Sequence, residues 1–406
     1  MRMIYKIRYA AVILLILVSA SFAICQTVKT DVLVVGATPA GLAAAIQSAH
    51  SGVKTLLIDN GNFEELRLSA EEAKVRSGIY AQFIRRVEIA QKFAYNDNQK
   101  LSPAFVASIF KAWADTVKNL TISAKTNVNN IRKDGKIWSA ELSGKRTVKA
   151  DVVVDASENE YVSAMAAVKR ASGLPDSIPY HTKKYRTGIA LIPSGQVFPA
   201  TLPLVNLTGD PENFLFSSAS GAVAGTATGQ AAGAAAAYCA FFKTTSKKLN
   251  VRVIQSELLS FGAHLLAFDD IARKDSNAAA IQSIALTGIL KGKMVGGKLL
   301  FLPDSSVSTA EIVSPVKEYF TRSQIWFLDN SAERLTLKGV LNLIKFVASR
   351  GEELNREVEK GWTSSLKLPG KFDAQRVATR REFAVLFNAY VKPFSVAVDL
   401  DGNLKR

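Results

Sequence analysis

The stretch Asp31-Val-Leu-Val-Val-Gly36-Ala-Thr-Pro-Ala-Gly41-Leu-Ala-Ala-Ala-Ile46 decides the fold of this chain. Its apolar run, residues 32–35, is short and rich in β-branched side chains, which predicts a buried parallel strand. A glycine turn follows, and Pro39 suits the first turn of an alanine-rich helix because no N–H bond is lost there. The free N–H groups and the dipole of such a helix start are suited to hold a phosphate. The stretch therefore predicts the entrance of a nucleotide-binding unit.

A second apolar strand completes this unit. Residues 53–58 lead into Asp59, about twenty residues past the first glycine, where a carboxylate can accept hydrogen bonds from an adenosine ribose. The pattern G-x-G-x-x-G is incomplete because Thr38 takes the second glycine position, where its hydroxyl could donate to a phosphate. A βαβ unit whose glycines only make a tight turn is the alternative. The order strand, helix, strand, acid favours nucleotide binding.

Length and composition are those of a globular protein. The 406 residues are 48% hydrophobic and 21% charged, enough for two or three domains with large cores. A formal charge of +16 suggests acidic partners or a polyanionic surface. The basic excess is spread along the chain without interleaved aromatic residues, so we expect no nucleic-acid partner, and we assign no metal ligands.

Residues 1–26 have the features of a signal peptide. Basic residues precede an uncharged apolar core at residues 10–20, and Ser21-Phe-Ala23 is an acceptable cleavage site. We therefore expect a periplasmic or secreted protein without a retained transmembrane helix, since the apolar core is short for a membrane span. Cys25 is either lipidated or removed. Its removal leaves Cys239 alone, so no intrachain disulfide can form.

The middle of the chain alternates between helical and strand-like patterns. Helical periodicity covers residues 79–93 and 103–117, and Asp134-Gly135 predicts a hairpin turn before residues 137–142. Residues 148–155 predict another buried parallel strand. The uncharged run 221–242 has glycines four residues apart, which lie on one helical face. We favour a helix packed closely on the sheet over a membrane span, because alanine and glycine are only weakly apolar.

Together, residues 31–59, 151–164 and 213–240 resemble FAD-dependent oxidoreductases of the fumarate reductase and glutathione reductase type, including secreted bacterial members that start with V-V-G-A-T-P-A-G. The resemblance implies an α/β fold of the FAD-binding Rossmann type with a small antiparallel insertion, and FAD as cofactor. The first motif and the acid at the end of the second strand would bind the ADP half, and the G-Q-A-A-G helix would point its start at the flavin. The cofactor residues implied are Gly36, Thr38, Ala40, Gly41, Asp59, Ser157, Gly229, Gln230 and Gly233.

Departures from that family favour a rival interpretation. Glu158 replaces a glycine beside the cofactor, and the region between Asp155 and Gly221 is short for a substrate domain. Candidate catalytic residues are His181 and Arg186, although a polar surface loop explains their cluster equally well. We expect an oxidoreductase acting on a small or carbohydrate-like substrate. The alternative is a degenerate flavoprotein fold that serves as a cell-envelope glycan-binding or scaffolding protein.

The last 140 residues or so resemble S-layer homology repeats. One copy begins at Phe268, and a poorer copy runs from Ile325 to Thr379-Arg-Arg-Glu382. The resemblance implies that Arg380 binds an anionic cell-envelope polysaccharide. A helical cap that binds nothing is the alternative. We thus expect a signal peptide (1–26), a Rossmann-like domain (27–245) and a mainly helical module (246–406).

Overall fold

The structure is a computed structural model that describes residues 27–61, 77–92, 102–171, 182–193, 199–217, 222–272 and 274–405. The predicted signal peptide, with Cys25, and the candidate catalytic residue His181 lie outside these ranges. The predictions made for them are therefore not addressed by the structure.

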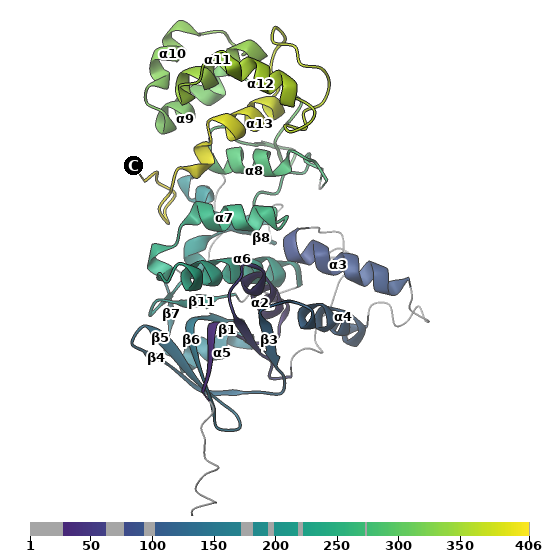
Figure 1. Ribbon diagram of the computed structural model, residues 1–406, viewed down its shortest axis with the longest axis vertical. Helices are drawn as coiled ribbons and strands as arrows, with labels where there is room; N and C mark the ends of the chain where they lie inside the picture. Colours follow the sequence, from purple (N-terminus) through teal and green to yellow (C-terminus); the bar gives the residue numbers. More distant parts are fainter. Residues whose placement is uncertain are drawn as a thin grey trace, which may run out of the picture.

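A seven-stranded sheet forms one end of the molecule (Figure 1). Its parallel part has the order β3 (Leu120–Ser123), β2 (Thr55–Ile58), β1 (Thr27–Val35) and β6 (Arg146–Asp155), with β11 (Phe214–Phe216) beside the carboxyl end of β6. On the amino half of β6, the antiparallel strands β5 (Ile137–Leu142) and β4 (Val128–Asp134) extend the sheet. The mixed α/β, Rossmann-like fold class is confirmed, and so is the hairpin at Asp134-Gly135.

The strand β1 shows why the sheet is buried on both faces. Val32 and Val34 point into the larger core, beneath the helices α2 (Pro39–His50) and α6 (Ala222–Phe241). Leu33 and Val35 point to the opposite face, into a core that includes Trp138. All four side chains are almost completely buried, as the continuous apolar run predicts for a central parallel strand.

Two further helices flank α2. They are α3 (Gly78–Gln91) and α4 (Pro103–Asp115), close to the helical segments predicted at 79–93 and 103–117. Phe83 of α3 and Phe110 of α4 are buried, with ring centroids 4.5 Å apart. Helix α4 has Pro103 in its first turn, as expected for a helix start. Ser102 caps this helix by accepting the N–H of Phe105.

The uncharged run forms α6, which packs along α2 and on the sheet. Among the residues that the structure describes, no helix is both long and apolar enough to cross a membrane. The preference for a helix packed on the sheet is confirmed.

Several short elements lie outside the main sheet and the longer helices. They are α5 (Tyr161–Met165), β7 (Lys169–Arg170), β8 (Gly188–Pro193), β9 (Pro199–Pro203), β10 (Gly209–Asp210), β12 (Lys293–Val295) and β13 (Lys298–Leu300). The module itself contains α7 (Val251–Ser260), α8 (Ala278–Thr287), α9 (Thr309–Tyr319), α10 (Ser323–Asp329), α11 (Leu337–Ala348), α12 (Glu353–Gly361) and α13 (Arg380–Tyr390). In Figure 1, α7 and α8 lie between the sheet with its covering helices and the helices α9–α13.

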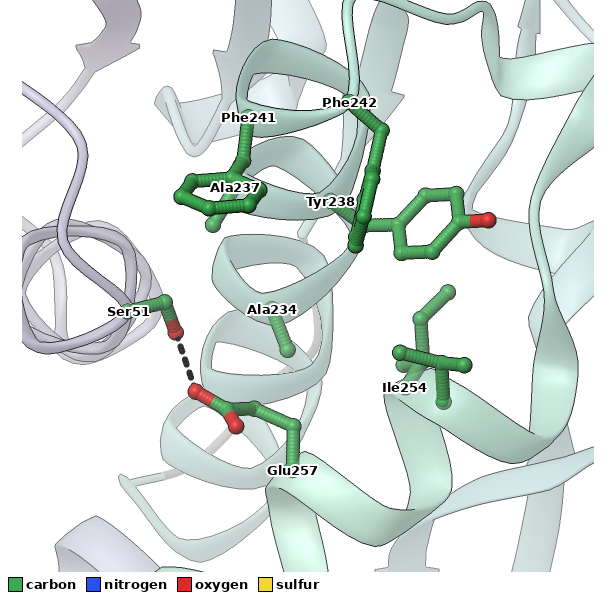
Figure 2. A pocket seen from close by; sticks show the side chains of 9 residues that line it. Ser51, Ala234, Ala237, Tyr238, Phe241, Phe242, Ile254 and Glu257 are labelled. Carbon is green, nitrogen blue, oxygen red and sulfur yellow. Dashed lines mark hydrogen bonds between the residues drawn. The ribbon is translucent and has the colours of Figure 1, made fainter.

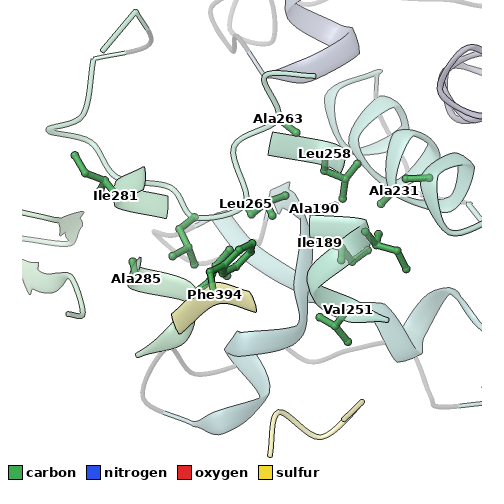
Figure 3. Close-up of a cluster of buried hydrophobic side chains, with 14 of the residues drawn as sticks. Ile189, Ala190, Ala231, Val251, Leu258, Ala263, Leu265, Ile281, Ala285 and Phe394 are labelled. Atoms are coloured by element: carbon green, nitrogen blue, oxygen red, sulfur yellow. The ribbon is translucent and has the colours of Figure 1, made fainter. Parts of the chain in front are cut away.

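One hydrophobic core runs through this junction. Figure 3 shows Ile189 of β8, Val251 and Leu258 of α7, and Phe394 among its members. The same cluster continues to α2 and α6 on one side and to α11 and α13 on the other. The Rossmann-like domain and the helical module predicted on either side of residue 245 therefore share their core.

Three helix starts meet inside the helical module. Ser308, Thr336 and Thr379 each cap the helix that follows them, accepting the N–H three residues ahead. Antiparallel bridges join the three segments pairwise, as Ser306–Thr379, Ser308–Arg334 and Thr336–Val377. The structure thus corrects the expected two copies to three related helix starts. Thr336 starts one helix and Thr379 another, although both lie within the predicted second copy.

Candidate nucleotide-binding site

The start of α2 offers unpaired hydrogen-bond donors at the carboxyl edge of the sheet. Gly36 follows β1 and donates to Ile58 O at 2.9 Å, which ties the turn between β1 and α2 to the end of β2. Among the described residues, the N–H groups of Ala37, Thr38 and Ala40 make no hydrogen bond. Unpaired N–H groups at a helix start form a binding site for an anion such as a phosphate.

Thr38 closes this turn through its side chain. Its hydroxyl accepts the N–H of Gly41 at 3.2 Å and donates its proton to Ala156 O at 2.9 Å. The single hydroxyl proton is therefore used within the protein. This corrects the expectation that the Thr38 side chain donates to a phosphate. Threonine instead caps α2 and ties the turn to the end of β6.

Gly36 and Gly41 are required by close backbone packing. Gly36 has φ +103°, and an added Cβ would lie 2.5 Å from Ala156 O. A Cβ on Gly41 would lie 1.8 Å from Gly36 O. A side chain at position 36 would push the turn away from Ala156, and one at position 41 would push the start of α2 away from Gly36. These glycines shape the anion-binding turn even though their contacts are internal.

Asp59 stands at the same edge, directly after β2. Asp59 is only 5% exposed, and its Oδ1 accepts the N–H of Gly61 at 2.8 Å. Its Oδ2 accepts no hydrogen bond within the described ranges. Because Val35 pairs with Ile58, Asp59 lies beside the Gly36 turn. One carboxylate oxygen is thus available for a hydrogen bond, and the contact of Asp59 with a ribose stays a prediction.

The loop after β6 is closed by Asp155. Its carboxylate accepts the N–H and the hydroxyl of Ser157, at 3.0 and 2.5 Å, and the N–H of Ser163 at 2.7 Å. Burial raises the pKa of Asp155, and these hydrogen bonds oppose the rise. Sequence reasoning missed this role, although the D-x-S spacing is a signal for such a side-chain turn. Ser157, which the sequence predicts to bind the cofactor, donates both its N–H and its hydroxyl proton to Asp155.

Glu158 is exposed at the start of the short 3-10 helix Glu158–Glu160. The next residues, Asn159 and Glu160, have left-handed backbones with φ of 51° and 54°. Such conformations cost about 1 kcal/mol or more each for non-glycine residues. The loop thus differs from the glycine-containing motif in sequence, and it holds two non-glycine residues in a left-handed conformation.

The structure gives the residues of the G-Q-A-A-G helix packing roles. A Cβ on Gly229 would lie 2.0 Å from Ala40 O, and one on Gly233 would lie 2.3 Å from Ala44 O. The buried Gln230 side chain accepts the N–H of Ile79 and donates to Gln47, at 3.0 and 2.9 Å. Because α6 begins at Ala222, these residues lie inside the helix and not at its start. The structure shows these packing contacts, and a position of these residues near the flavin stays a prediction.

Arg186 is also placed away from these loops. Its guanidinium donates to both carboxylate oxygens of Glu318 in α9, at 3.0 and 2.7 Å, and to Gly402 O at 3.3 Å. The residue is 4% exposed. Its side chain therefore joins the sheet-containing part to the helical module and is not available to a substrate. The catalytic role predicted for Arg186 is corrected.

Arg380 is buried in the helical module, with 1% exposure. It pairs with Glu311, and it donates to Phe301 O at 2.7 Å and to Lys291 O. A guanidinium with these internal partners cannot reach a polysaccharide on the surface. The proposed contact between Arg380 and an anionic glycan is therefore corrected to a structural role at the junction of the three helix starts.

The sequence profile of a family described as FAD dependent oxidoreductase matches residues 31–183. Residues 31–183 are therefore similar to FAD-dependent oxidoreductases. The matched segment contains the α2 turn, Asp59 and the Asp155 loop, and the cofactor that this similarity indicates is FAD. No curated protein matches the chain at a significant level.

Parts of several solved structures are similar to part of this chain. The p-nitrophenol 4-monooxygenase PnpA from Pseudomonas putida is 15% identical, covering 37% of this chain and 45% of its own, with a TM-score of 0.28. The thioredoxin reductase of T. acidophilum is 21% identical over 31% of this chain and 34% of its own, with a TM-score of 0.23. The bacillithiol disulfide reductase of Staphylococcus aureus is 15% identical, covering 33% and 40%, with a TM-score of 0.24. This chain spans less than half the length of each of these proteins.

The residues present fit the ADP half of FAD. The unpaired N–H groups of Ala37, Thr38 and Ala40 suit a diphosphate, and the available Oδ2 of Asp59 suits a ribose. The residues expected around the flavin ring fit less well, because Ser157 and Gln230 are engaged internally. The described part of the site is thus built for the nucleotide end of the cofactor.

Proposed function

We propose that the protein is an exported FAD-dependent oxidoreductase acting on a small or carbohydrate-like substrate. One observation carries the proposal. N–H groups without a hydrogen-bond partner at the start of α2 lie at the same edge of the sheet as an available carboxylate oxygen of Asp59. The family match over residues 31–183 supports the redox class. Export is supported by the sequence features of residues 1–26.

When bound, FAD supplies the electron-accepting chemistry, and the protein supplies binding and orientation. The start of α2 would hold the diphosphate against its dipole, and Asp59 would fix the adenosine ribose. Thr38 holds the two cofactor loops together through Ala156 O. These residues would determine where the cofactor lies.

The test starts with protein isolated from the periplasm or culture medium of an expressing host. We expect a flavin absorbance spectrum, release of FAD on denaturation, and reoxidation of the photoreduced protein when an electron acceptor is added. N-terminal sequencing should place the mature start between Ile24 and Thr27. Folded protein that takes up no FAD would contradict the proposal. An intact Met1 on cytoplasmic protein would contradict export alone.

A second candidate is a flavoprotein fold retained as an envelope glycan-binding or scaffolding protein. The observation that favours it is the placement of Arg186 in an internal ion pair, together with the closed Asp155 loop. This candidate predicts retention of the full chain on cell-envelope polysaccharide without substrate oxidation. Equal retention of wild type and Arg380→Ala at a temperature where both are folded would agree with the buried position of Arg380.

A further inference from the structure

A groove of about 220 Å³ lies between α6 and α7, near the end of α2 (Figure 2). It is larger than the cavity of about 150 Å³ that accepts benzene in an engineered protein core. The floor contains Ala234 and Ala237 of α6 and Ile254 of α7. The groove exists because alanines occupy this face of α6, where longer side chains would fill the space between the two helices.

Aromatic side chains form one end of the groove. Phe241 and Phe242 are 65% and 57% exposed, and their ring centroids lie 5.1 Å apart. Tyr238 lies behind Phe242, with ring centroids 4.7 Å apart. Large exposed apolar side chains at the rim of a concave site indicate a surface that a ligand covers.

A carboxylate forms the other end. Glu257 of α7 accepts the hydroxyl proton of Ser51 at 2.7 Å, as Figure 2 shows. Ser51 is the residue that follows α2. Within the described ranges, Glu257 has no cationic partner, and its Oε2 accepts no hydrogen bond. The groove therefore carries an unneutralised negative charge at one end and apolar walls along its length.

We propose that this groove binds a primary ammonium compound with an apolar tail the size of an aromatic ring. The ammonium would donate to Glu257, and the tail would lie on Ala234, Ala237 and Ile254 beneath the two phenylalanines. The site is separate from the nucleotide site, because α2 runs between them and its twelve residues span about 18 Å.

Two lysines that follow Phe242 in the chain lie close to carboxylates, which favours an amine over an anionic membrane as the occupant. Lys243 is paired with Asp151 at 2.8 Å and lies 3.9 Å from Asp31. Lys247 lies 3.4 Å from Asp210. These lysines are neutralised by neighbouring carboxylates, so they add little attraction for anionic lipid headgroups. The carboxylate of Glu257, by contrast, attracts a cation.

The test is calorimetric titration of the full chain with 2-phenylethylammonium and with its uncharged analogue 2-phenylethanol. We expect the ammonium to bind at least tenfold more tightly than the alcohol. Glu257→Gln should remove that preference, weakening the ammonium about tenfold or more, as expected for a lost charge-assisted hydrogen bond. Phe242→Ala should weaken both ligands. Glu359→Gln, an exposed carboxylate of α12, is the matched control and should change neither affinity.

Three results would overturn the proposal. The first is no binding of the ammonium at millimolar concentration by folded wild-type protein. The second is equal binding of ammonium and alcohol that Glu257→Gln leaves unchanged, which would make the groove a general apolar site. The third is Phe242-dependent binding to vesicles of phosphatidylglycerol and phosphatidylcholine, or Phe242-dependent dimerisation, without binding of the ammonium. None of these results depends on whether the chain carries FAD.

Discussion

The Arg186 guanidinium lies 2.7 Å from a carboxylate oxygen of Glu318, joining a segment that precedes β8 to helix α9 of the helical module. The backbone carbonyl of Arg186 also accepts the side-chain N–H of Gln255 from α7, at 2.9 Å. Arg186 thus fixes the packing of the sheet-containing part against the module with both its side chain and its backbone.

Removing the guanidinium should destabilise the whole chain because both parts share one core. We expect Arg186→Met to lower the free energy of unfolding by about 2–3 kcal/mol, less than for a fully buried pair because Glu318 is partly exposed. Denaturant unfolding of Arg186→Met, Glu318→Gln and the double variant measures this. The double variant should lose less than the sum of the two single losses. Full additivity would show that the pair is not coupled.

The same pair predicts a pH dependence of stability. The hydrogen bond from Arg186 is the main cause that lowers the pKa of Glu318 below 4.5, against the effect of burial. A carboxyl with a lowered folded-state pKa stabilises the protein above its unfolded-state pKa, and this contribution is lost as the pH falls through the folded-state value. The stability difference between wild type and Glu318→Gln should therefore shrink below about pH 4.5. A difference that is constant with pH would contradict this.

Gly229 should be irreplaceable for packing reasons. A Cβ would lie 2.0 Å from Ala40 O, so Gly229→Ala should separate α6 from α2 and cost about 1–3 kcal/mol. Gly339→Ala is the matched control, because its Cβ would meet no atom closer than 3.5 Å. The control should be neutral or stabilising by up to about 1 kcal/mol. Thermal unfolding compares the two, and an equal effect of both substitutions would refute the packing role.

Arg380 should act on folding and not on glycan recognition. Arg380→Lys keeps the charge but cannot make all the contacts to Glu311, Phe301 O and Lys291 O. We expect a loss of about 3 kcal/mol in the free energy of unfolding. Binding to envelope polysaccharide should be unchanged while the variant is folded. Weaker retention without a loss of stability would restore the surface role.

Local patterns predict the first half of the chain well. The strand at residues 32–35, the helix after Gly36 and the hairpin at Asp134-Gly135 follow from apolar periodicity and turn residues, which act over short distances. The position of Asp59 beside the Gly36 turn follows from parallel pairing of adjacent strands.

Long-range contacts explain where sequence patterns mislead. Gly229 and Gly233 match a cofactor motif, but the backbone of α2, nearly two hundred residues earlier in the chain, leaves no room for a side chain at either position. From the sequence alone, Arg186 and Arg380 are expected to be available to ligands, whereas in the structure they pair with Glu318 and Glu311. No periodicity indicates these partners, because each ion pair joins segments that meet only in the folded chain.

The most direct test of the account is a titration of folded protein with FAD, followed by the change in flavin fluorescence. Wild type should bind FAD, and Asp59→Ala should bind it about 10–100-fold more weakly, because the ribose loses a charged acceptor. Asp134→Ala, in the exposed hairpin turn, is the matched control and should bind like wild type. Folded wild-type protein that binds no FAD, or an Asp59→Ala variant with wild-type affinity, would contradict the nucleotide site at β1, α2 and Asp59.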